Sequence, residues 1–169
     1  GCVIVDAKGQ ILGQGHTQQA GGHHAEIAAL QDAARRGHSV AGATAYVTLE
    51  PCSHHGRTAP CCDALIQAKV GKVVAALADP NPLVSGQGFD RLKAAGVEVE
   101  VGQGALLAEQ QNPGFLSRMR RQKPWVRLKI AASLDGQTAL QNGQSQWITG
   151  PDARADGHAW RARACAILT

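Results

Sequence analysis

The sequence has 169 residues and an ordinary apolar share of 44%, which suits one large domain or one domain plus part of another. No run approaches the roughly 18 apolar residues of a membrane helix, so the pattern excludes a membrane span. The net charge of +4 is modest and much of it falls in residues 118–123, which favours a solvated helix end or linker over a nucleic-acid surface.

The first two thirds of the chain alternate short strands with helices. Residues 2–5 and 11–14 are apolar runs on either side of a turn, which predicts a hairpin. Residues 24–36 carry alanines at helical spacing between glycines, which predicts a helix. Further strands are expected at 45–49, 73–77 and 97–101, and further helices at 61–69 and 89–95. This alternation indicates a layered α/β domain with a largely parallel sheet, apart from the hairpin.

The last third of the sequence is typical of the start of a second α/β unit. Residues 112–123 predict a connecting helix, and Lys123-Pro124 is a natural break. After the break we expect a strand at 126–130, a turn at 133–136, a helix at 152–164 and a strand from 165 to 169. We therefore divide the chain into domains 1–122 and 123–169. Because the sequence begins and ends in strand-like residues, we expect it to be a fragment of a longer chain.

Four residues of the first domain form the pattern of a catalytic zinc site. His24 and Glu26 fall in the first turn of a predicted helix, and Cys52 and Cys61 each follow a proline. One imidazole and two thiols are three zinc ligands, which leave one tetrahedral position for water. Glu26 is placed to shuttle protons rather than to bind the metal. Both metal segments fall at helix N-termini, where the helix dipole favours thiolates.

The remaining cysteines and histidines leave one alternative open. Cys62 adjoins Cys61 and could replace it as a ligand, but neighbouring helix positions point about 100° apart. Cys61 is favoured because it follows Pro60, as in the signature of zinc nucleobase deaminases. Cys2 and Cys165 are typical of buried small side chains, and we interpret His23 as structural. An odd number of cysteines argues against a disulfide framework, so we expect a cytoplasmic protein.

The two cysteines of the zinc pattern are unusually far apart for that signature. Eight residues separate Cys52 from Cys61, where a Cys-x-x-Cys pair is usual. A longer loop at the mouth of the site can carry its own substrate contacts, and His54, His55 and Arg57 suit a phosphorylated ligand. The alternative interpretation is an exposed polar loop without a role in binding.

These motifs together resemble the bifunctional deaminase–reductase family of riboflavin biosynthesis. The resemblance is carried by TLEPCSHHGRTAPCCDALI at 48–66 with HAE at 24–26. It continues through DPNPLVSGQG at 79–88, KIAASLDGQTA at 129–139 and SQWITG at 145–150, and so covers essentially the whole sequence. The long cysteine gap and the second-unit motifs make the resemblance specific.

The resemblance implies a fold, two activities and a set of site residues. The implied fold is a cytidine-deaminase-like three-layer α/β/α domain, followed by the truncated start of a dihydrofolate-reductase-like α/β domain. The first domain would use Zn²⁺ to deaminate 2,5-diamino-6-(5-phosphoribosylamino)pyrimidin-4-one. The second would use NADPH to reduce the ribosyl group to ribityl. The resemblance assigns metal ligands to His24, Cys52 and Cys61, proton transfer to Glu26, substrate contacts to His54, Arg57, Ser145 and Arg161, and cofactor contacts to Ala131 and Trp147.

The sequence also departs from the family pattern. The family has an N-terminal helix and an Asn-Pro-x-Val-Gly loop whose asparagine contacts the pyrimidine. Gly1 matches the last residue of that loop, so we expect this contact to be absent. Many members have a histidine seven residues before the zinc histidine, where this chain has Thr17, with His16 one place earlier. Because the reductase part is short, we expect no reductase activity from this chain alone.

Two other functions were weighed against this hypothesis. A cytidine or tRNA-adenosine deaminase is disfavoured by the cysteine gap, by the second unit and by the lack of interleaved aromatic and basic residues. A zinc-stabilised binding module would need a fourth protein ligand, such as Cys62 or His55, and would leave Glu26 without a role. The expected partner is a small phosphorylated pyrimidine, with no nucleic acid and no membrane, and a homo-oligomer stays open.

Overall fold

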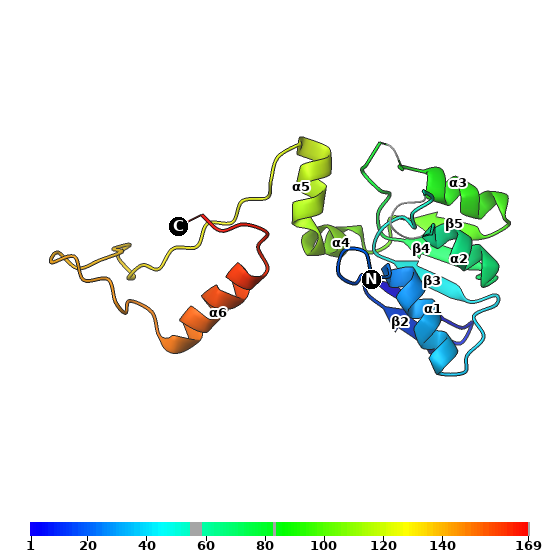
Figure 1. The fold of residues 1–169 in the computed structure, drawn as a ribbon, viewed down its shortest axis with the longest axis horizontal. Coiled ribbons are helices and arrows are strands. Elements are labelled where there is room, and N and C mark those ends of the chain that lie inside the picture. Colours follow the sequence, from blue (N-terminus) through cyan, green and yellow to red (C-terminus); the bar gives the residue numbers. More distant parts are fainter. Residues whose placement is uncertain (55–58, 83, 169) are drawn as a thin grey trace. The chain divides into compact units, whose positions relative to one another are not determined.

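The computed structural model describes residues 1–54, 59–82 and 84–168 and divides into two compact units (Figure 1). The first unit is Gly1–Trp125 and the second is Val126–Thr169. The predicted boundary between residues 122 and 123 lies close to this division and stays a prediction. In the part of the chain that the structure describes, no helix combines the length and apolarity needed to cross a lipid bilayer.

The first unit is built on one five-stranded sheet in the order β2-β1-β3-β4-β5. Its strands are β1 (Cys2–Val5), β2 (Ile11–Gly15), β3 (Thr44–Val47), β4 (Lys72–Ala75) and β5 (Glu98–Val101). β1 pairs antiparallel with both β2 and β3, whereas β3, β4 and β5 are parallel. The expectation of a largely parallel sheet therefore holds only for the last three strands. β1 runs against β3 because its tight turn into β2 and the returning helix bring the chain back beside it in the opposite direction.

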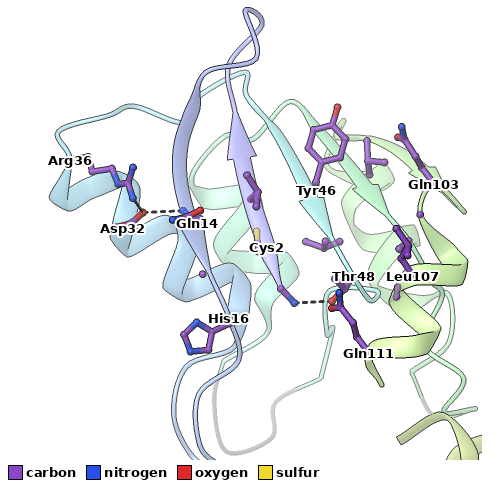
Figure 2. A pocket seen from close by; sticks show the side chains of 18 residues that line it. Cys2, Gln14, His16, Asp32, Arg36, Tyr46, Thr48, Gln103, Leu107 and Gln111 are labelled. Carbon is purple, nitrogen blue, oxygen red and sulfur yellow. Dashed lines mark hydrogen bonds and ion pairs between the residues drawn. The ribbon is translucent and has the colours of Figure 1, made fainter. Parts of the chain in front are cut away.

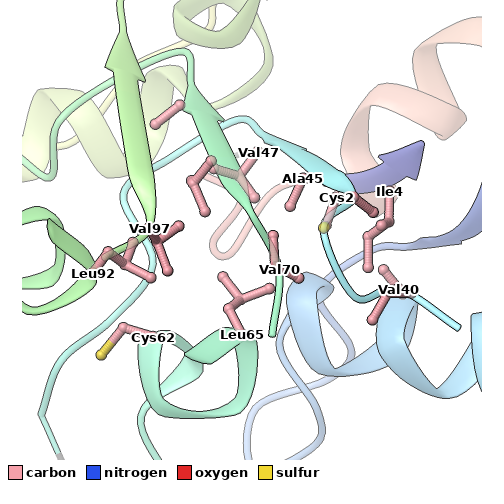
Figure 3. Close-up of a cluster of buried hydrophobic side chains, with 14 of the residues drawn as sticks. Cys2, Ile4, Val40, Ala45, Val47, Cys62, Leu65, Val70, Leu92 and Val97 are labelled. Atoms are coloured by element: carbon pink, nitrogen blue, oxygen red, sulfur yellow. The ribbon is translucent and has the colours of Figure 1, made fainter. Parts of the chain in front are cut away.

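Three helices cover one face of this sheet and enclose the main core. They are α1 (Ala25–Arg35), α2 (Cys61–Gln67) and α3 (Gln87–Ala94). Alternate residues of the strands point into this core, among them Ile4, Ala45 and Val73, each with no exposed surface. Figure 3 shows Leu65 of α2 and Leu92 of α3 in the same cluster. This packing fixes where the helices begin, and the candidate site lies at two of those beginnings.

Two short helices belong to the opposite face of the sheet. α4 (Ala105–Gln111) and α5 (Pro113–Arg121) contribute Ala108 and Leu116 to a second, smaller cluster with Ala76 and Leu77. The sequence predicted one connecting helix at 112–123, but the chain bends at Asn112 and α4 was not foreseen. With helices on both faces, the expected three-layer α/β/α arrangement is confirmed.

The second unit contains one helix, α6 (Pro151–Ala162), within its described residues 126–168. The strands expected at 126–130 and 165–169 were wrong for the residues that the structure describes, which are irregular there, while Thr169 lies outside them. A strand needs a hydrogen-bonded neighbour, and residues 126–168 offer none within this unit. Val126, Leu128 and Ile130 consequently remain 60–80% exposed.

Candidate metal centre

The first part of the site is the start of α1, which the sequence positions through small residues. His24 is the N-cap of α1, and Glu26 is the second residue of the helix. α1 presents Ala25, Ala29 and Ala33 to the core, and these buried alanines let the helix approach β2 closely. The two elements share the most extensive contact of any pair in the unit. This packing therefore fixes the distance between the start of α1, which carries His24 and Glu26, and the sheet.

The second part of the site joins the end of β3 to the start of α2. Cys52 follows β3 after a short extension, and Cys61 is the first residue of α2. The Cys61 backbone N–H donates to Cys52 Sγ over 3.3 Å, and the Cys62 N–H donates to the Cys52 carbonyl over 3.2 Å. Because the first N–H groups of a helix have no partner inside the helix, Cys52 caps α2 and is drawn against Cys61.

The three ligand atoms lie as close together as a zinc ion requires. His24 Nδ1 is 3.5 Å from Cys52 Sγ and 3.4 Å from Cys61 Sγ, and all three ligand atoms lie within 4.8 Å of one another. In a tetrahedral zinc site the donor atoms are roughly 3.5–3.8 Å apart, given Zn–S of about 2.3 Å and Zn–N of about 2.0–2.1 Å. The three side chains therefore fit zinc. Within the described residues this cluster leaves one tetrahedral position without a protein ligand.

The electrostatics of the cluster favour one anionic sulfur. Hydrogen bonding from the Cys61 side chain and backbone lowers the pKa of Cys52 to about 5, against the opposing effect of burial. The same shared hydrogen bond, with burial, raises the pKa of Cys61. Glu26 is only 8% exposed, and burial raises the pKa of its carboxyl above the ordinary value. The first turn of α1 thus brings a buried carboxyl group close to a cysteine whose ionised form is favoured.

Cys62, the alternative ligand, does not join the cluster. Its side chain is fully buried in the main core (Figure 3). Its thiol lies 3.8 Å from Asp63 Oδ1. Of the residues described, only His24, Cys52 and Cys61 form a group that could hold a metal. His23 points elsewhere, since Gln31 Nε2 lies 3.1 Å from its ring nitrogen. The sequence preference for Cys61 agrees with this geometry.

The loop between the two cysteines is only partly described. His54 is exposed at a bend directly after the metal segment, whereas Arg57 and His55 lie outside the described residues. Burial raises the pKa of the Asp79 carboxyl, which lies in the segment after β4. This segment lies beside the residues that lead to Cys52, since the Asp79 N–H donates to Glu50 Oε2 over 3.1 Å.

One residue beside the site, Glu50, was not predicted from the sequence. It directly follows the strand expected at 45–49 and lies two residues before Cys52, and its side chain is only 5% exposed. A signal was present, because an acidic residue flanked by apolar positions at the end of a core strand needs buried partners.

The residues assigned to a second site by the resemblance are not gathered by the second unit. Ala131 is half-buried, Ser145 and Trp147 are exposed, and Arg161 is half-buried. Trp147 stacks against the Arg154 guanidinium at 4.4 Å, and Arg161 lies 2.7 Å from His158 Nδ1. Within residues 126–168 no hydrogen bond, ion pair or ring contact joins any two of the four.

A hollow of about 610 Å³ lies away from the metal cluster, on the face of the sheet that faces α4 (Figure 2). Tyr46 of β3, Gln14 of β2 and Leu107 of α4 line it, and none of His24, Glu26, Cys52 and Cys61 does. We therefore locate the candidate active site by its clustered titratable side chains and not by this hollow.

Comparison with known families finds two matches, one within the first structural unit and one that begins close to the second. Residues 1–77 match the model of the cytidine and deoxycytidylate deaminase zinc-binding region, and residues 124–169 match the RibD C-terminal domain. The zinc-binding region contains all three clustered ligands.

Individual relatives match the chain along its whole length. Riboflavin biosynthesis protein RibD of Escherichia coli is 57% identical over 169 residues, which are 100% of this chain and 45% of that protein. RibD of Haemophilus influenzae is 53% identical over 100% of this chain and 44% of its own length. The chain thus spans less than half the length of these curated relatives.

Solved structures agree with the fold. Acinetobacter baumannii RibD, form 2, is 52% identical with a TM-score of 0.86, over 98% of this chain and 45% of that one. A diaminohydroxyphosphoribosylaminopyrimidine deaminase/5-amino-6-(5-phosphoribosylamino)uracil reductase from Thermotoga maritima is 38% identical with a TM-score of 0.87. This match covers 95% of the present chain and 45% of the Thermotoga maritima chain.

Proposed function

Over its whole length the chain belongs to the RibD family of riboflavin biosynthesis proteins, and on this premise we propose that its first domain is a zinc-dependent deaminase. The proposed substrate is 2,5-diamino-6-(5-phosphoribosylamino)pyrimidin-4-one, whose exocyclic amine is released as ammonia. The single observation that carries the proposal is the convergence of His24, Cys52 and Cys61 next to the buried Glu26.

In this proposal the three clustered side chains hold the metal and shape its surroundings. When bound by these residues, a zinc ion would supply an activated water molecule as the nucleophile near neutral pH. Cys52 is ready to bind because its thiolate is already favoured by the Cys61 hydrogen bonds. The N-termini of α1 and α2 both point their positive ends toward the cluster, which favours anionic ligands there.

Glu26 is the proposed proton shuttle. A hydrolytic deamination needs a group that takes a proton from water and returns it to the leaving amine. Glu26 is not among the clustered metal ligands, and it stands two residues from His24 on the rigid first turn of α1. Its burial removes competing water, so the carboxyl group can exchange a proton with the reacting groups at low cost.

The remaining assignments are proposals that rest on the family resemblance. We assign substrate contacts of the deaminase to His54 and Arg57. In the protein at its natural length, the second domain would act on the deaminated product with NADPH, through Ala131 and Trp147 for the cofactor and Ser145 and Arg161 for the substrate. We propose a domain boundary between residues 122 and 123, a cytoplasmic location and a small-molecule partner.

Replacing Glu26 tests this function. We expect Glu26→Gln to lower kcat for ammonia release by about 10²–10⁴-fold, since an amide cannot transfer the proton, while zinc content stays at the parental level. Glu98→Gln is the matched control, because Glu98 lies on β5, is 65% exposed and pairs with Lys72 of β4. The assay uses zinc-loaded protein at its natural length and the diaminopyrimidine ribosyl phosphate. Parental activity in Glu26→Gln would refute the shuttle, and turnover of cytidine instead would refute the substrate.

A further inference from the structure

Glu50 is a buried carboxylate that the proposed mechanism does not use. It follows β3 and precedes Pro51 and Cys52, and it is 5% exposed. From the described residues its side chain accepts three backbone hydrogen bonds: from Asp79 N–H over 3.1 Å and Gly86 N–H over 3.0 Å at Oε2, and from Gly88 N–H over 2.9 Å at Oε1. A buried charge is stable when several donors surround it, and here both oxygens are engaged.

The three donors share one location in the fold, the connection from β4 into α3. Gly86 is the N-cap of α3 and Gly88 is the second residue of that helix. The N-cap residue, a glycine, has no side chain to cap the helix, so Glu50 performs this task from a distant part of the sequence. Asp79 lies four residues after the end of β4. One carboxylate therefore holds this connection at two separate points.

α3 approaches the metal-ligand segment closely on both sides of Cys52. A Cβ atom at Gly88 would lie 2.1 Å from the Pro51 carbonyl oxygen, so only glycine permits this approach. On the far side, Arg91 donates to the Ser53 carbonyl over 3.2 Å and pairs with Asp63 over 2.8 Å. The residues before and after Cys52 are thus both attached to α3.

The same connection carries Asp79, whose Oδ1 accepts the Asn81 N–H over 2.9 Å. The Glu50 backbone N–H donates to the Leu77 carbonyl over 2.9 Å, so backbone and side chain of Glu50 both join the segment before Cys52 to the connection after β4. We infer that Glu50 is a positioning residue, whose three hydrogen bonds hold the connection after β4 against the Cys52 segment and so fix the surface beside the metal cluster on which the substrate would lie. This inference rests on the proposed deaminase function.

Glu50→Gln is the perturbation that separates this role from metal binding. The amide is nearly the same size but replaces one oxygen with an N–H₂ group, which must face at least one of the three N–H donors. We expect KM for the diaminopyrimidine ribosyl phosphate to rise about tenfold with kcat within about threefold, and zinc content to be unchanged. We also expect amide exchange at Gly86 and Gly88 to accelerate by at least about tenfold. Glu100→Gln, at an exposed carboxylate paired with Lys72, is the matched control.

Several outcomes would overturn the inference. An unchanged KM in Glu50→Gln, or loss of zinc with the rise in KM, would show that Glu50 serves stability or the metal instead. If Glu50→Gln does not fold, the same measurements are made on Glu50→Asp. This variant keeps the carboxylate charge but has a shorter side chain, and the same rise in KM is expected. Amide exchange in the unaltered protein needs no variant: rapid exchange at Asp79, Gly86 and Gly88 would refute the hydrogen bonds. Absence of ammonia release by the unaltered protein would refute the function alone, since amide exchange still tests Glu50.

Discussion

The contact between α1 and β2 makes Gly15 a sensitive position, although it lies outside the ligand set. Gly15 ends β2 and pairs with Cys2. A Cβ atom at Gly15 would lie 2.5 Å from Ala29 N and 2.6 Å from the Ala25 carbonyl oxygen, both of which are helix backbone. Ordinary contact begins at about 3.4 Å, so Gly15→Ala requires α1 to withdraw from the sheet by about 0.9 Å.

This displacement has an expected size in stability and in function. Overpacking a core of this kind costs about 1–3 kcal/mol of unfolding free energy. The first turn of α1 carries His24 and Glu26, and metal ligands tolerate deviations of only about 0.2 Å, so zinc affinity should fall as well. A misplacement near 1 Å in a catalytic group lowers activity by up to about 10²-fold.

Three measurements check the prediction on the same protein samples. Urea unfolding gives the loss of stability, competition with a chelator gives zinc affinity, and ammonia release gives kcat/KM. Gly114→Ala in α5 is the matched control, because a Cβ atom there meets nothing within 4 Å and should be neutral or stabilising by up to about 1 kcal/mol. If Gly15→Ala unfolds at the parental urea concentration and binds zinc with parental affinity, close packing against β2 does not position α1.

Two further predictions concern the cysteine pair and an ion-paired carboxylate. Cys61→Ala should reduce the zinc content well below one ion per chain. Cys62→Ala should keep the metal and lose about 1 kcal/mol of unfolding free energy, because it removes a buried core side chain. Loss of zinc in Cys62→Ala would contradict the ligand assignment. The Gln14 N–H and then Arg36 hold the pKa of Asp32 below 3.8, so its stabilising effect is present above that pH and disappears as the pH falls through the lower, folded-state pKa. The difference in urea midpoint between the zinc-free parent and Asp32→Asn should therefore shrink in acid, and a constant difference would contradict this.

The sequence predicted the site better than it predicted the sheet. His24, Cys52 and Cys61 were identified because metal ligation restricts residue types and neighbours, and the alanine spacing of α1 indicated which segment would carry His24. Helix ends were also close, since glycines such as Gly37 and Gly96 mark them by adopting positive φ.

Features that depend on distant partners were missed. Ala105–Gln111 has too few periodic apolar residues to predict a helix alone, and α4 forms because Ala108 packs into the small cluster with Leu116. The alternating residues 126–130 looked like a strand, but the described part of their unit contains no neighbouring strand. The position of Glu50 indicates that it needs buried partners, but not which ones, because its three donors lie 29–38 residues further along the chain.

The separation of the three ligands along the chain links the metal to the cooperativity of folding. His24 is 28 residues from Cys52, and Cys52 is 9 residues from Cys61, so a bound ion acts as a cross-link that closes one long and one short loop of the unfolded chain. Closing such loops removes chain entropy from the denatured ensemble, as a disulfide does, and the binding free energy becomes folding free energy. In a protein whose thiols stay reduced, this reversible cross-link would make the stability of the first unit depend on the concentration of free zinc.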